Sequence, residues 1–574
     1  MENNVKSSLW KYKYFNILIL PVILFILTYL FFGFYFEAND DYAISLLLKG
    51  EWQPQGGAFE ISYIHSLLSL AYSFLYKNIP SFPWYGMFIC LFNLIATINI
   101  IIIIDHTLSK YHNQFVENIL IILLYSILIL ENIFLINFAR TSIILAGSSL
   151  ILILDTVIDN KEFKHKILLL ILYTVFFVLG FMTRPEAGIL TTLLIFPFAF
   201  FIALKLKNLK STIYAIIIFS LLVLFLQYTF IYLIPPKKLA GESYDLIPEK
   251  YELYMLNLNE FEFTKNIKIA NNKDSLKIEA LKFRFSSDKK MLTNDFLEKY
   301  STSNIFSFSK LTLHRFKVVL YDILNYVINL YIGITVINLF LFIVMIFGSY
   351  ENRKFIIIIY LVPQVLFFLL LFSIDVFMKM PERIFVPLYT VFTVCNLWQM
   401  QRLKINPKFN KFSNIFLILI IISFSASSYY VILKHNSIKA QNKENIQIFD
   451  YLGNKFNNTT FLITLNSYSL LEHLDPLKNL DVNNNKLLPI VGWTINLPSY
   501  YKELKSISSS SDIYGFLNYI CNNRNYIIIS DEKFIEFLTS YFKILYNNEF
   551  KFVSEFEIPD IIKERDLNLY TIKK

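Results

Sequence analysis

The segment YFNILILPVILFILTYLFFGFYFEANDDY, Tyr14–Tyr42, runs from a long apolar stretch directly into two adjacent aspartates, Asp40 and Asp41. The stretch Tyr14–Phe36 is long enough to cross a hydrocarbon core of ~30 Å as a helix. It is too long for a signal-peptide core and no small-residue cleavage site follows it, so we expect an uncleaved first membrane span. Carboxylates at the edge of a bilayer are costly next to lipid, which raises the question of what the two aspartates contact.

The composition extends this interpretation to the whole chain. Of the 574 residues, 55% are hydrophobic, and the mean hydropathy is +0.49, whereas a soluble chain of this length carries more charge. The formal net charge of +9 is therefore first a topology signal rather than a sign of nucleic-acid binding. The three cysteines are far apart and no HExxH, CxxC, Walker or GxGxxG motif occurs, so nothing indicates a disulfide framework or a metal site.

Recurrent apolar runs predict a polytopic α-helical membrane protein with about eleven transmembrane helices. Lys6, Lys11 and Lys13 place the N-terminus on the cytoplasmic side, and nearly all the short basic loops then fall on the same side, as the positive-inside rule requires. The predicted spans are residues 14–36, 84–104, 117–137, 141–158, 167–183, 187–204, 211–234, 322–347, 354–374, 383–399 and 412–432.

This topology requires that the segment Ile61–Asn78 does not cross the membrane, because an extra crossing would move every later basic loop to the opposite side. Ser62, Ser66, Ser69 and Ser73 recur at helical spacing and form one polar stripe. We therefore expect an amphipathic helix that lies in the interface. The alternative is an ordinary span that carries small polar residues.

The composition changes after the last predicted span. Short apolar runs, Phe461–Leu465 and Tyr526–Ser530, are typical of buried strands, and helix-like stretches lie between them. We expect a transmembrane domain over 1–434 and a small soluble α/β domain over 435–574 on the extracytoplasmic face of a cell inner or plasma membrane. The transmembrane domain then contains a first outer loop at 37–83 and a large outer loop at 235–320.

Ionisable residues collect at the outer ends of the predicted spans. Such groups are expensive at this depth unless they are paired or face water, so several of them from distant parts of the chain predict one polar cavity at the outer interface. These residues are Asp40, Asp41, Arg140, Arg184, Glu186, Lys379, Glu382 and Arg383.

Each of these residues also has an ordinary structural explanation. One aspartate is expected to cap the helix Tyr42–Lys49, but a cap needs only one carboxylate. Arg184 and Glu186 are compatible with an ion pair across a tight turn. Lys379 and Arg383 are compatible with snorkelling to lipid phosphates. The clustering on one predicted face is the observation that favours a site.

The ionisable residues at the outer ends of the spans suit a reaction in which a nucleophile displaces a phosphate group from a carbon atom. A carboxylate can take the proton of a hydroxyl nucleophile, and arginine or lysine stabilises the charge that develops on a phosphate leaving group. No ATP is present on the outer side, so an activated sugar must arrive there attached to a lipid phosphate.

The segment FEANDDYAISLLLKG, Phe36–Gly50, and the order of elements around it resemble the GT-C superfamily of integral membrane glycosyltransferases. This superfamily uses polyprenyl-phosphate sugars and includes the protein O-mannosyltransferases and the aminoarabinose transferase of lipid A. The matching features are the basic N-terminus, the acidic motif after the first span, interfacial helices, a large outer loop after the seventh span and a C-terminal outer domain. The resemblance covers the whole chain in architecture and is closest over residues 1–234.

The resemblance implies roles for individual residues. The family's catalytic aspartate corresponds to Asp41 or Asp40, with Asp41 favoured as the base and Asp40 as its cap or partner. The turns TRPEA, Thr183–Ala187, and MPERIF, Met380–Phe385, are similar to phosphate-facing turns of bacterial members. The implied phosphate ligands are Arg184, Lys379, Arg383 and, as a less secure fourth, Arg140, with Glu186 and Glu382 as supporting residues.

One departure from the family concerns metal binding. Many members have a further acid in the second outer loop and bind a divalent metal, whereas this loop, Asn137–Thr141, has no acid. We therefore expect a site without a metal or other cofactor, in which cations bind the phosphate. The alternative is a divalent cation held by Glu186 and Glu382 together with the two aspartates.

Two further regions contain candidate substrate contacts. In the large outer loop, Tyr244, His314 and Arg315 are expected either to close over the substrates or to serve as packing. Trp493 in the C-terminal domain offers a ring for stacking on a sugar, but we expect it to be a buried core residue.

The sequence as a whole predicts an inverting hexosyl- or pentosyltransferase. Its expected partners are a polyprenyl-phosphate sugar donor, an envelope glycan, glycolipid or protein acceptor and the lipid bilayer, with no nucleic acid. A transporter or flippase is the main competing function, although such proteins place ionisable residues near the bilayer midplane. An O-antigen-type polymerase, which the early acidic motif fits less well, and a non-catalytic envelope assembly protein also compete with the transferase.

Overall fold

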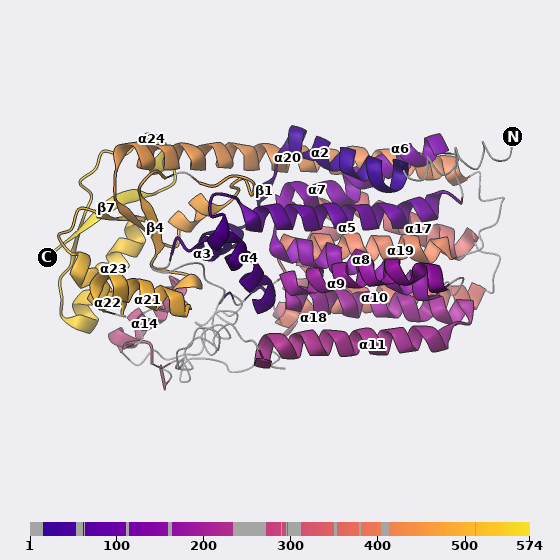
Figure 1. The fold of residues 1–574 in the computed structure, drawn as a ribbon, viewed down its shortest axis with the longest axis horizontal. Coiled ribbons are helices and arrows are strands. Elements are labelled where there is room, and N and C mark those ends of the chain that lie inside the picture. Colours follow the sequence, from indigo (N-terminus) through magenta and orange to yellow (C-terminus); the bar gives the residue numbers. More distant parts are fainter. Residues whose placement is uncertain are drawn as a thin grey trace.

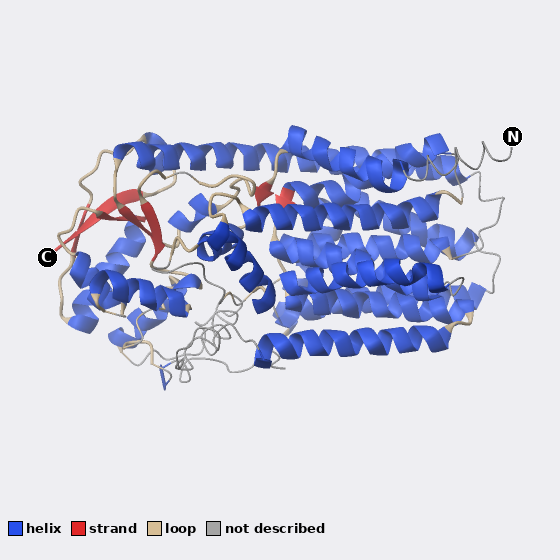
Figure 2. Ribbon diagram, in the orientation of Figure 1, coloured by secondary structure: helices blue, strands red, loops and turns tan. Residues whose placement is uncertain are grey.

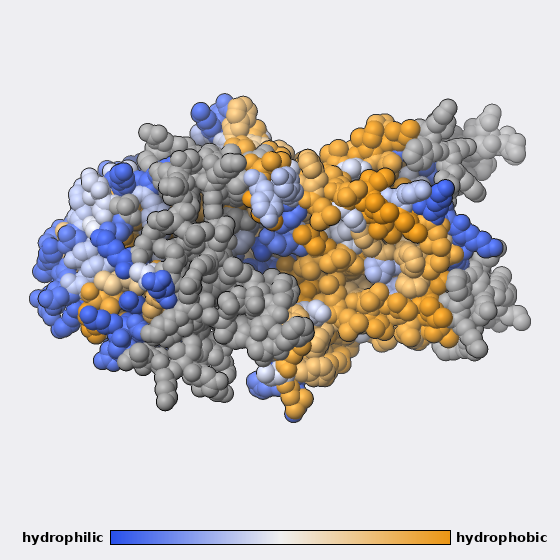
Figure 3. Space-filling view, turned by 90° about the horizontal axis from the view of Figure 1, so that it is seen from below, coloured by the Kyte–Doolittle hydropathy of each residue, from blue (hydrophilic) through white to orange (hydrophobic). Residues whose placement is uncertain are grey.

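The computed structural model describes residues 15–52, 61, 63–110, 114–158, 163–233, 271–286, 288, 290–293, 295–296, 311–348, 353–377, 380–402, 412–480, 482–510 and 512–574. Its helices form a long bundle, and a smaller α/β domain that contains the C-terminus lies at one end of this bundle (Figure 1). On the face drawn in Figure 3, an apolar surface covers the bundle and hydrophilic residues lie at both of its ends.

The bundle is that of a multi-pass membrane protein. Among the described residues, nine helices are long and apolar enough to cross a membrane, or ten if one bent pair counts as a span. The bundle helices are η1 (Phe15–Ile19), α2 (Leu20–Phe32), α5 (Trp84–Leu108), α6 (Gln114–Leu124), η2 (Tyr125–Ile129), α7 (Leu130–Phe134), α8 (Phe138–Ile158), α9 (Phe163–Thr183), α10 (Pro185–Leu206), α11 (Leu209–Tyr228), η3 (Thr229–Leu233), α16 (Leu313–Leu324), η5 (Asn325–Leu330), α17 (Ile332–Gly348), α18 (Arg353–Phe377), α19 (Glu382–Gln401) and α20 (Phe412–Lys455).

The predicted span 322–347 is not one straight helix. The chain bends by 90° at Tyr331, between η5 and α17. Two residues at the bend make contacts with distant segments. The Tyr331 hydroxyl donates to Glu131 and Glu382, and Gly333 packs so closely on α20 that a Cβ would lie 2.1 Å from the Ser427 hydroxyl. Hydropathy does not register such contacts, which explains why the sequence predicted one continuous span.

The predicted span 383–399 corresponds to α19, which fails the hydropathy test for a span although it is a 20-residue helix. Every side chain from Phe385 to Gln401 is buried in the protein. Polar side chains of α19 bond to neighbouring helices: Asn338 donates to Thr393 at 2.9 Å and Asn396 donates to Asn338 at 2.8 Å. A helix surrounded by other helices does not contact lipid and therefore tolerates polar residues that pair across the interface.

The first loop contains two short helices, α3 (Asn39–Lys49) and α4 (Ser66–Asn78). Helix α3 ends at Gly50, whose φ of 87° lies in the left-handed region that glycine adopts without strain. Helix α4 has 13 residues and is not among the candidate spans of the described chain. Ser66 and Ser69 of α4 are fully buried in the protein, and its exposed side chains include apolar Phe74.

The C-terminal domain is built on a five-stranded sheet of order β4-β3-β5-β7-β6 (Figure 2). Strands β3, β4 and β5 are parallel, and β7 and β6 add antiparallel pairs at one edge. The predicted strands 461–465 and 526–530 correspond to β3 and β5. The elements are β3 (Thr460–Ile463), η7 (Ser467–Leu471), β4 (Lys486–Pro489), η8 (Thr494–Asn496), α21 (Pro498–Ser508), α22 (Ile513–Ile520), β5 (Tyr526–Ser530), α23 (Glu532–Tyr546), β6 (Lys551–Val553), α24 (Asp560–Lys563) and β7 (Asn568–Lys573).

The two predicted domains are more closely joined than the sequence indicated. The boundary at 434/435 lies inside the continuous helix α20. In addition, part of the large predicted loop belongs to the C-terminal domain: helix α14 (Asn272–Lys282) packs on α23, and Asp288 accepts hydrogen bonds from Tyr541 and Tyr546. Residues of the large predicted loop therefore pack as part of the C-terminal domain.

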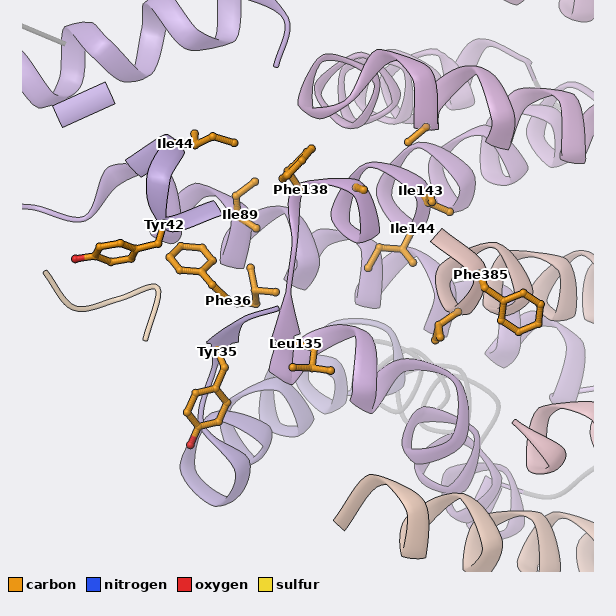
Figure 4. Close-up of a cluster of buried hydrophobic side chains, with 14 of the residues drawn as sticks. Tyr35, Phe36, Tyr42, Ile44, Ile89, Leu135, Phe138, Ile143, Ile144 and Phe385 are labelled. Atoms are coloured by element: carbon orange, nitrogen blue, oxygen red, sulfur yellow. The ribbon is translucent and has the colours of Figure 1, made fainter. Parts of the chain in front are cut away.

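A short parallel sheet lies where the bundle meets the domain. Strand β1 (Tyr35–Phe36) pairs with β2 (Leu135–Ile136), so the chain that follows the first span runs beside the chain that enters α8. Buried side chains from β1, β2, α3, α5, α8 and α19 surround this pair (Figure 4). This apolar core fixes the position of the acidic segment that follows β1.

Candidate functional site

Asp41 is buried at the centre of this junction. Its side chain has no exposed surface and its two oxygens accept three hydrogen bonds, from Tyr85 at 2.9 Å, Asn137 at 2.7 Å and the backbone N–H of Phe138 at 3.0 Å. Phe138 is the first residue of α8, so Asp41 binds the N-terminus of a different helix from its own. Helix α3 begins after Ala38 without a side-chain cap, and the predicted capping of residues 42–49 by an aspartate is wrong.

Burial determines how Asp41 titrates. Desolvation raises the pKa of its carboxyl to about 8, although the hydrogen bonds from Tyr85 and Phe138 lower it. An aspartate in the unfolded chain has a pKa of about 3.9, so between these two pH values the folded protein binds a proton that the unfolded chain does not. The stability from this group is complete below about pH 4 and is lost as the pH rises through 8, by up to about 1.4 kcal/mol for each pH unit.

We therefore expect the unfolding temperature of the wild type to fall between about pH 5 and about pH 8 relative to that of an Asp41→Asn variant, because the amide does not titrate. Thermal unfolding of both proteins in the same detergent, followed across this pH range, measures the difference. If the unfolding temperatures of the two proteins changed in parallel with pH, the raised pKa of Asp41 would be contradicted.

Asp40, in contrast, is accessible. About a fifth of its side chain is exposed, its Oδ2 lies 3.7 Å from Nη1 of Arg383, and its Oδ1 accepts a hydrogen bond of 3.0 Å from the indole N–H of Trp493. The three residues come from α3, from the start of α19 and from the C-terminal domain. The domain thus contributes directly to the surroundings of the acidic motif.

Arg184 is connected to Trp493 through the ring of Tyr63. Its guanidinium group lies 5.0 Å from the ring of Tyr63 and 4.9 Å from that of Phe138, and Tyr63 contacts Trp493 edge to face at 4.9 Å. A guanidinium over aromatic faces is held by cation–π attraction, and the Nε of Arg184 also lies 3.5 Å from the carboxylate of Glu186. The predicted residues Asp40, Arg383 and Arg184 therefore lie in one continuous cluster with Tyr63 and Trp493.

Backbone geometry presents Trp493 to this cluster. The preceding residue, Gly492, has a φ of 92°, which side chains rarely adopt, and its N–H donates to the carbonyl of Arg284. Trp493 is half-buried and points its N–H at Asp40, so the expectation of a buried core tryptophan is corrected. Glu472, from the same domain, accepts a hydrogen bond of 3.4 Å from Asn39, and burial together with the charge of Asp40 raises its pKa.

Arg140, predicted as a fourth phosphate ligand, is placed elsewhere. Its guanidinium group has no exposed surface and makes two hydrogen bonds of 2.6 Å to the carboxylate of Glu37. It also donates to Asn132 at 3.1 Å and contacts Glu131 at 3.4 Å. All of these partners are protein groups, so we remove Arg140 from the phosphate ligands and describe it as part of a buried ion network.

Lys434 extends this network to Glu382. Its ammonium group donates to Glu131 at 2.9 Å and also to Glu382, and the Tyr331 hydroxyl donates to the same two carboxylates at 3.1 and 3.3 Å. Glu382 therefore belongs to the ion network formed by Glu37, Arg140, Glu131, Lys434 and Glu382. The sequence analysis did not single out Glu37, Glu131 or Lys434. A lone glutamate inside an apolar run nevertheless indicates that a cation or hydrogen-bond donor lies next to it in the folded protein.

The remaining predicted site residues differ in their surroundings. Glu186 is half exposed and lies 3.5 Å from Arg184, as an ion pair across the turn between them. His314 is exposed at the first turn of α16, and Arg315 donates to the carbonyl of Asp375. Tyr244 and Lys379 lie outside the described residues.

No group of three or more His, Cys, Asp or Glu side chains in the described part of the chain is arranged to hold a metal ion. The described carboxylates do not gather as a metal site would require, because Glu382 pairs with Lys434 and Glu186 pairs with Arg184. The alternative of a divalent cation held by both glutamates and the two aspartates stays a prediction.

Comparisons of the chain with protein-family models, with curated proteins and with solved structures find no match. The function must accordingly be inferred from the chemistry of the site itself.

Proposed function

We propose that this membrane protein is an inverting glycosyltransferase that transfers a sugar from a polyprenyl-phosphate donor to a glycan, glycolipid or protein acceptor of the cell envelope. The observation that carries the proposal is one accessible carboxylate, Asp40, that contacts Arg383 and the indole N–H of Trp493, with Arg184 joined to Trp493 through the ring of Tyr63. In this proposal the site faces the extracytoplasmic side of a plasma or inner membrane, and the N-terminus is cytoplasmic.

Asp40 is the general base. It takes the proton of an acceptor hydroxyl, and the acceptor oxygen forms a bond to the anomeric carbon while the bond from that carbon to the phosphate oxygen breaks. The electron pair leaves with the polyprenyl phosphate, whose added negative charge Arg383 and Arg184 stabilise. Asp41 is not suited to this role because it is fully buried and its oxygens already accept three hydrogen bonds.

Elsewhere in the bundle, an apolar cavity offers a surface for the lipid part of the donor. An apolar cavity of about 250 Å³ lies between α16 and α18 and is lined mainly by Leu311, Leu313, Phe316, Phe372 and Val376. Arg315 lies at its edge, where a cation can contact the phosphate at the end of a hydrocarbon chain. This arrangement supports a lipid-linked donor over a soluble one.

Transfer by the purified protein in lipid vesicles tests the proposal. We expect the wild type to release polyprenyl phosphate from at least one member of a panel of radiolabelled polyprenyl-phosphate sugars when envelope extract is the acceptor, and to release nothing from nucleotide sugars. An Arg383→Gln variant should lower this release by roughly 10- to 100-fold, since it removes charge stabilisation of the leaving group.

The control variant is Arg565→Gln, because Arg565 pairs with Glu444 in the C-terminal domain at 2.8 Å; we expect it to retain wild-type transfer. Movement of intact labelled lipid across the vesicle membrane, with no release of polyprenyl phosphate, would instead identify a transporter.

A further inference from the structure

The contact between Arg383 and Asp40 does not by itself fix the first turn of α19. The two charged groups are 3.7 Å apart, and 35% of the Arg383 side chain is exposed. Ion pairs with this exposure contribute little and hold long side chains weakly. In addition, α19 begins after Pro381 without a side-chain cap. Other contacts of this turn therefore set the position of Arg383.

Lys434 of α20 holds the residue that precedes Arg383. Its ammonium group pairs with Glu382, the first residue of α19, and with Glu131 of α7 at 2.9 Å. The Tyr331 hydroxyl donates to the same two carboxylates, at 3.3 Å and 3.1 Å. Because Glu131 is itself buried in the bundle, these bonds connect the start of α19 to α7, to α20 and to the bend between η5 and α17.

A second set of contacts supports the same turn from η5. The Tyr326 hydroxyl donates to the backbone carbonyl of Met380 at 3.2 Å. The ring of Tyr326 also stacks on that of Phe385, with the ring centres 4.6 Å apart, and Phe385 is fully buried. The start of α19 is thus held by several neighbours, which orders the backbone from which Arg383 extends to Asp40.

Helix α20 also contacts the domain that supplies the other partner of Asp40. It runs from the bundle to the C-terminal domain (Figure 1), where Asn442 donates to the carbonyl of His473 at 2.7 Å. The N–H of His473 donates in turn to the carbonyl of Phe36 in β1 at 2.9 Å. The same domain contributes Trp493, which donates to Asp40. One helix therefore contacts the supports of both the cation and the indole beside this carboxylate.

We propose that Lys434 is a positioning residue of the transfer reaction, which holds Glu382 so that Arg383 stays opposite Asp40. This inference rests on the proposed function, in which Arg383 stabilises the leaving phosphate. Such a cation is most effective when it is in place before the bond breaks, since preorganised charge needs no rearrangement during the reaction. Lys434 acts without touching the substrate, because its ammonium group is shared between two protein carboxylates.

A double-mutant cycle on polyprenyl phosphate release tests the proposal. Lys434→Met should lower the maximal rate by about 10-fold with little change in the KM for the donor, as expected when transition-state stabilisation is lost. In the Arg383→Gln background the same change should have an effect of less than about twofold, because Lys434 acts through Arg383. Lys434→Arg should restore most of the rate. Equal losses in both backgrounds would show a merely structural role and overturn the proposal.

The matched control is Lys439→Met, the same substitution at an exposed lysine of α20, which should transfer as the wild type does. Glu382→Gln replaces Lys434→Met if the latter does not fold, since Lys434 then keeps Glu131 as its partner. It should likewise lower the rate only where Arg383 is present. A loss that persists in the Arg383→Gln background would overturn the proposal for this variant too.

Cross-linking measures the position of residue 383 without any transfer. Asp40→Cys and Arg383→Cys are combined with Cys521→Ser, because Cys521 is the native cysteine that is not buried, and a short bis-maleimide joins the introduced thiols. The yield should fall several-fold with Lys434→Met but not with Lys439→Met, and equal yields would overturn the proposal. A wild type that releases polyprenyl phosphate from no donor would overturn the proposed function, whereas the cross-linking yield would still decide whether Lys434 holds this turn.

Discussion

Replacing Asp40 by asparagine is expected to lower sugar transfer by roughly 10²- to 10⁴-fold, the range that a general base typically contributes. The amide can still accept a hydrogen bond from Trp493, which donates to Asp40 at 3.0 Å, so we expect the variant to fold. What it loses is the ability to take a proton from the acceptor hydroxyl.

The matched control for this prediction is Asp41→Asn, the same chemical change at the neighbouring position. Asp41 is fully buried and its oxygens accept hydrogen bonds from protein groups, so transfer by folded Asp41→Asn should stay within several-fold of the wild type. The initial rate of polyprenyl phosphate release, together with the unfolding temperature, separates the two variants. A large loss of transfer in folded Asp41→Asn, with activity kept in Asp40→Asn, would return the role of base to Asp41.

The second large effect concerns Arg140. An Arg140→Met variant is expected to lose about 3–5 kcal/mol of stability, because removing one partner of a buried ion pair leaves the opposite charge without compensation. Arg140 has no exposed surface and makes both of its 2.6 Å hydrogen bonds to Glu37. Without it, Lys434 is the one cation of the ion network that remains for Glu37, Glu131 and Glu382.

The free energy of unfolding from denaturant titration in detergent micelles measures this loss. Arg565→Met serves as the control, since the partner of Arg565, Glu444, is 45% exposed, and such surface pairs contribute about 1 kcal/mol or less. A double variant, Arg140→Met/Glu37→Gln, should regain part of the stability because it removes one of the orphaned charges. A loss no greater than that of the control would show that the network does not stabilise the fold.

Local sequence properties predicted the class of protein well. The length of an apolar run is a property of a single segment, so the sequence placed most of the candidate spans. The same reasoning located strands β3 and β5 in the C-terminal domain. It failed at Tyr331, where contacts with Glu131 and Glu382, both distant in the chain, accompany a bend of 90°.

The candidate site was predicted in part. Asp40, Arg184 and Arg383 were singled out because charge at a membrane edge needs a partner, and the structure brings them to one cluster around Trp493. The sequence favoured Asp41 over Asp40 and counted Arg140 as a ligand. Neither the burial of Asp41 nor the pairing of Arg140 with Glu37 is visible in residue types or spacing.

The amino-acid sequence by itself thus determined a multi-pass membrane protein with an acidic motif after its first span and an α/β domain at its end, because these follow from the hydropathy and period of short segments. Only the tertiary structure decided which aspartate is accessible, which cations remain near it and which residue of the C-terminal domain contacts it. The physical reason is that burial and pairing depend on neighbours hundreds of residues away, as when Trp493 donates to Asp40.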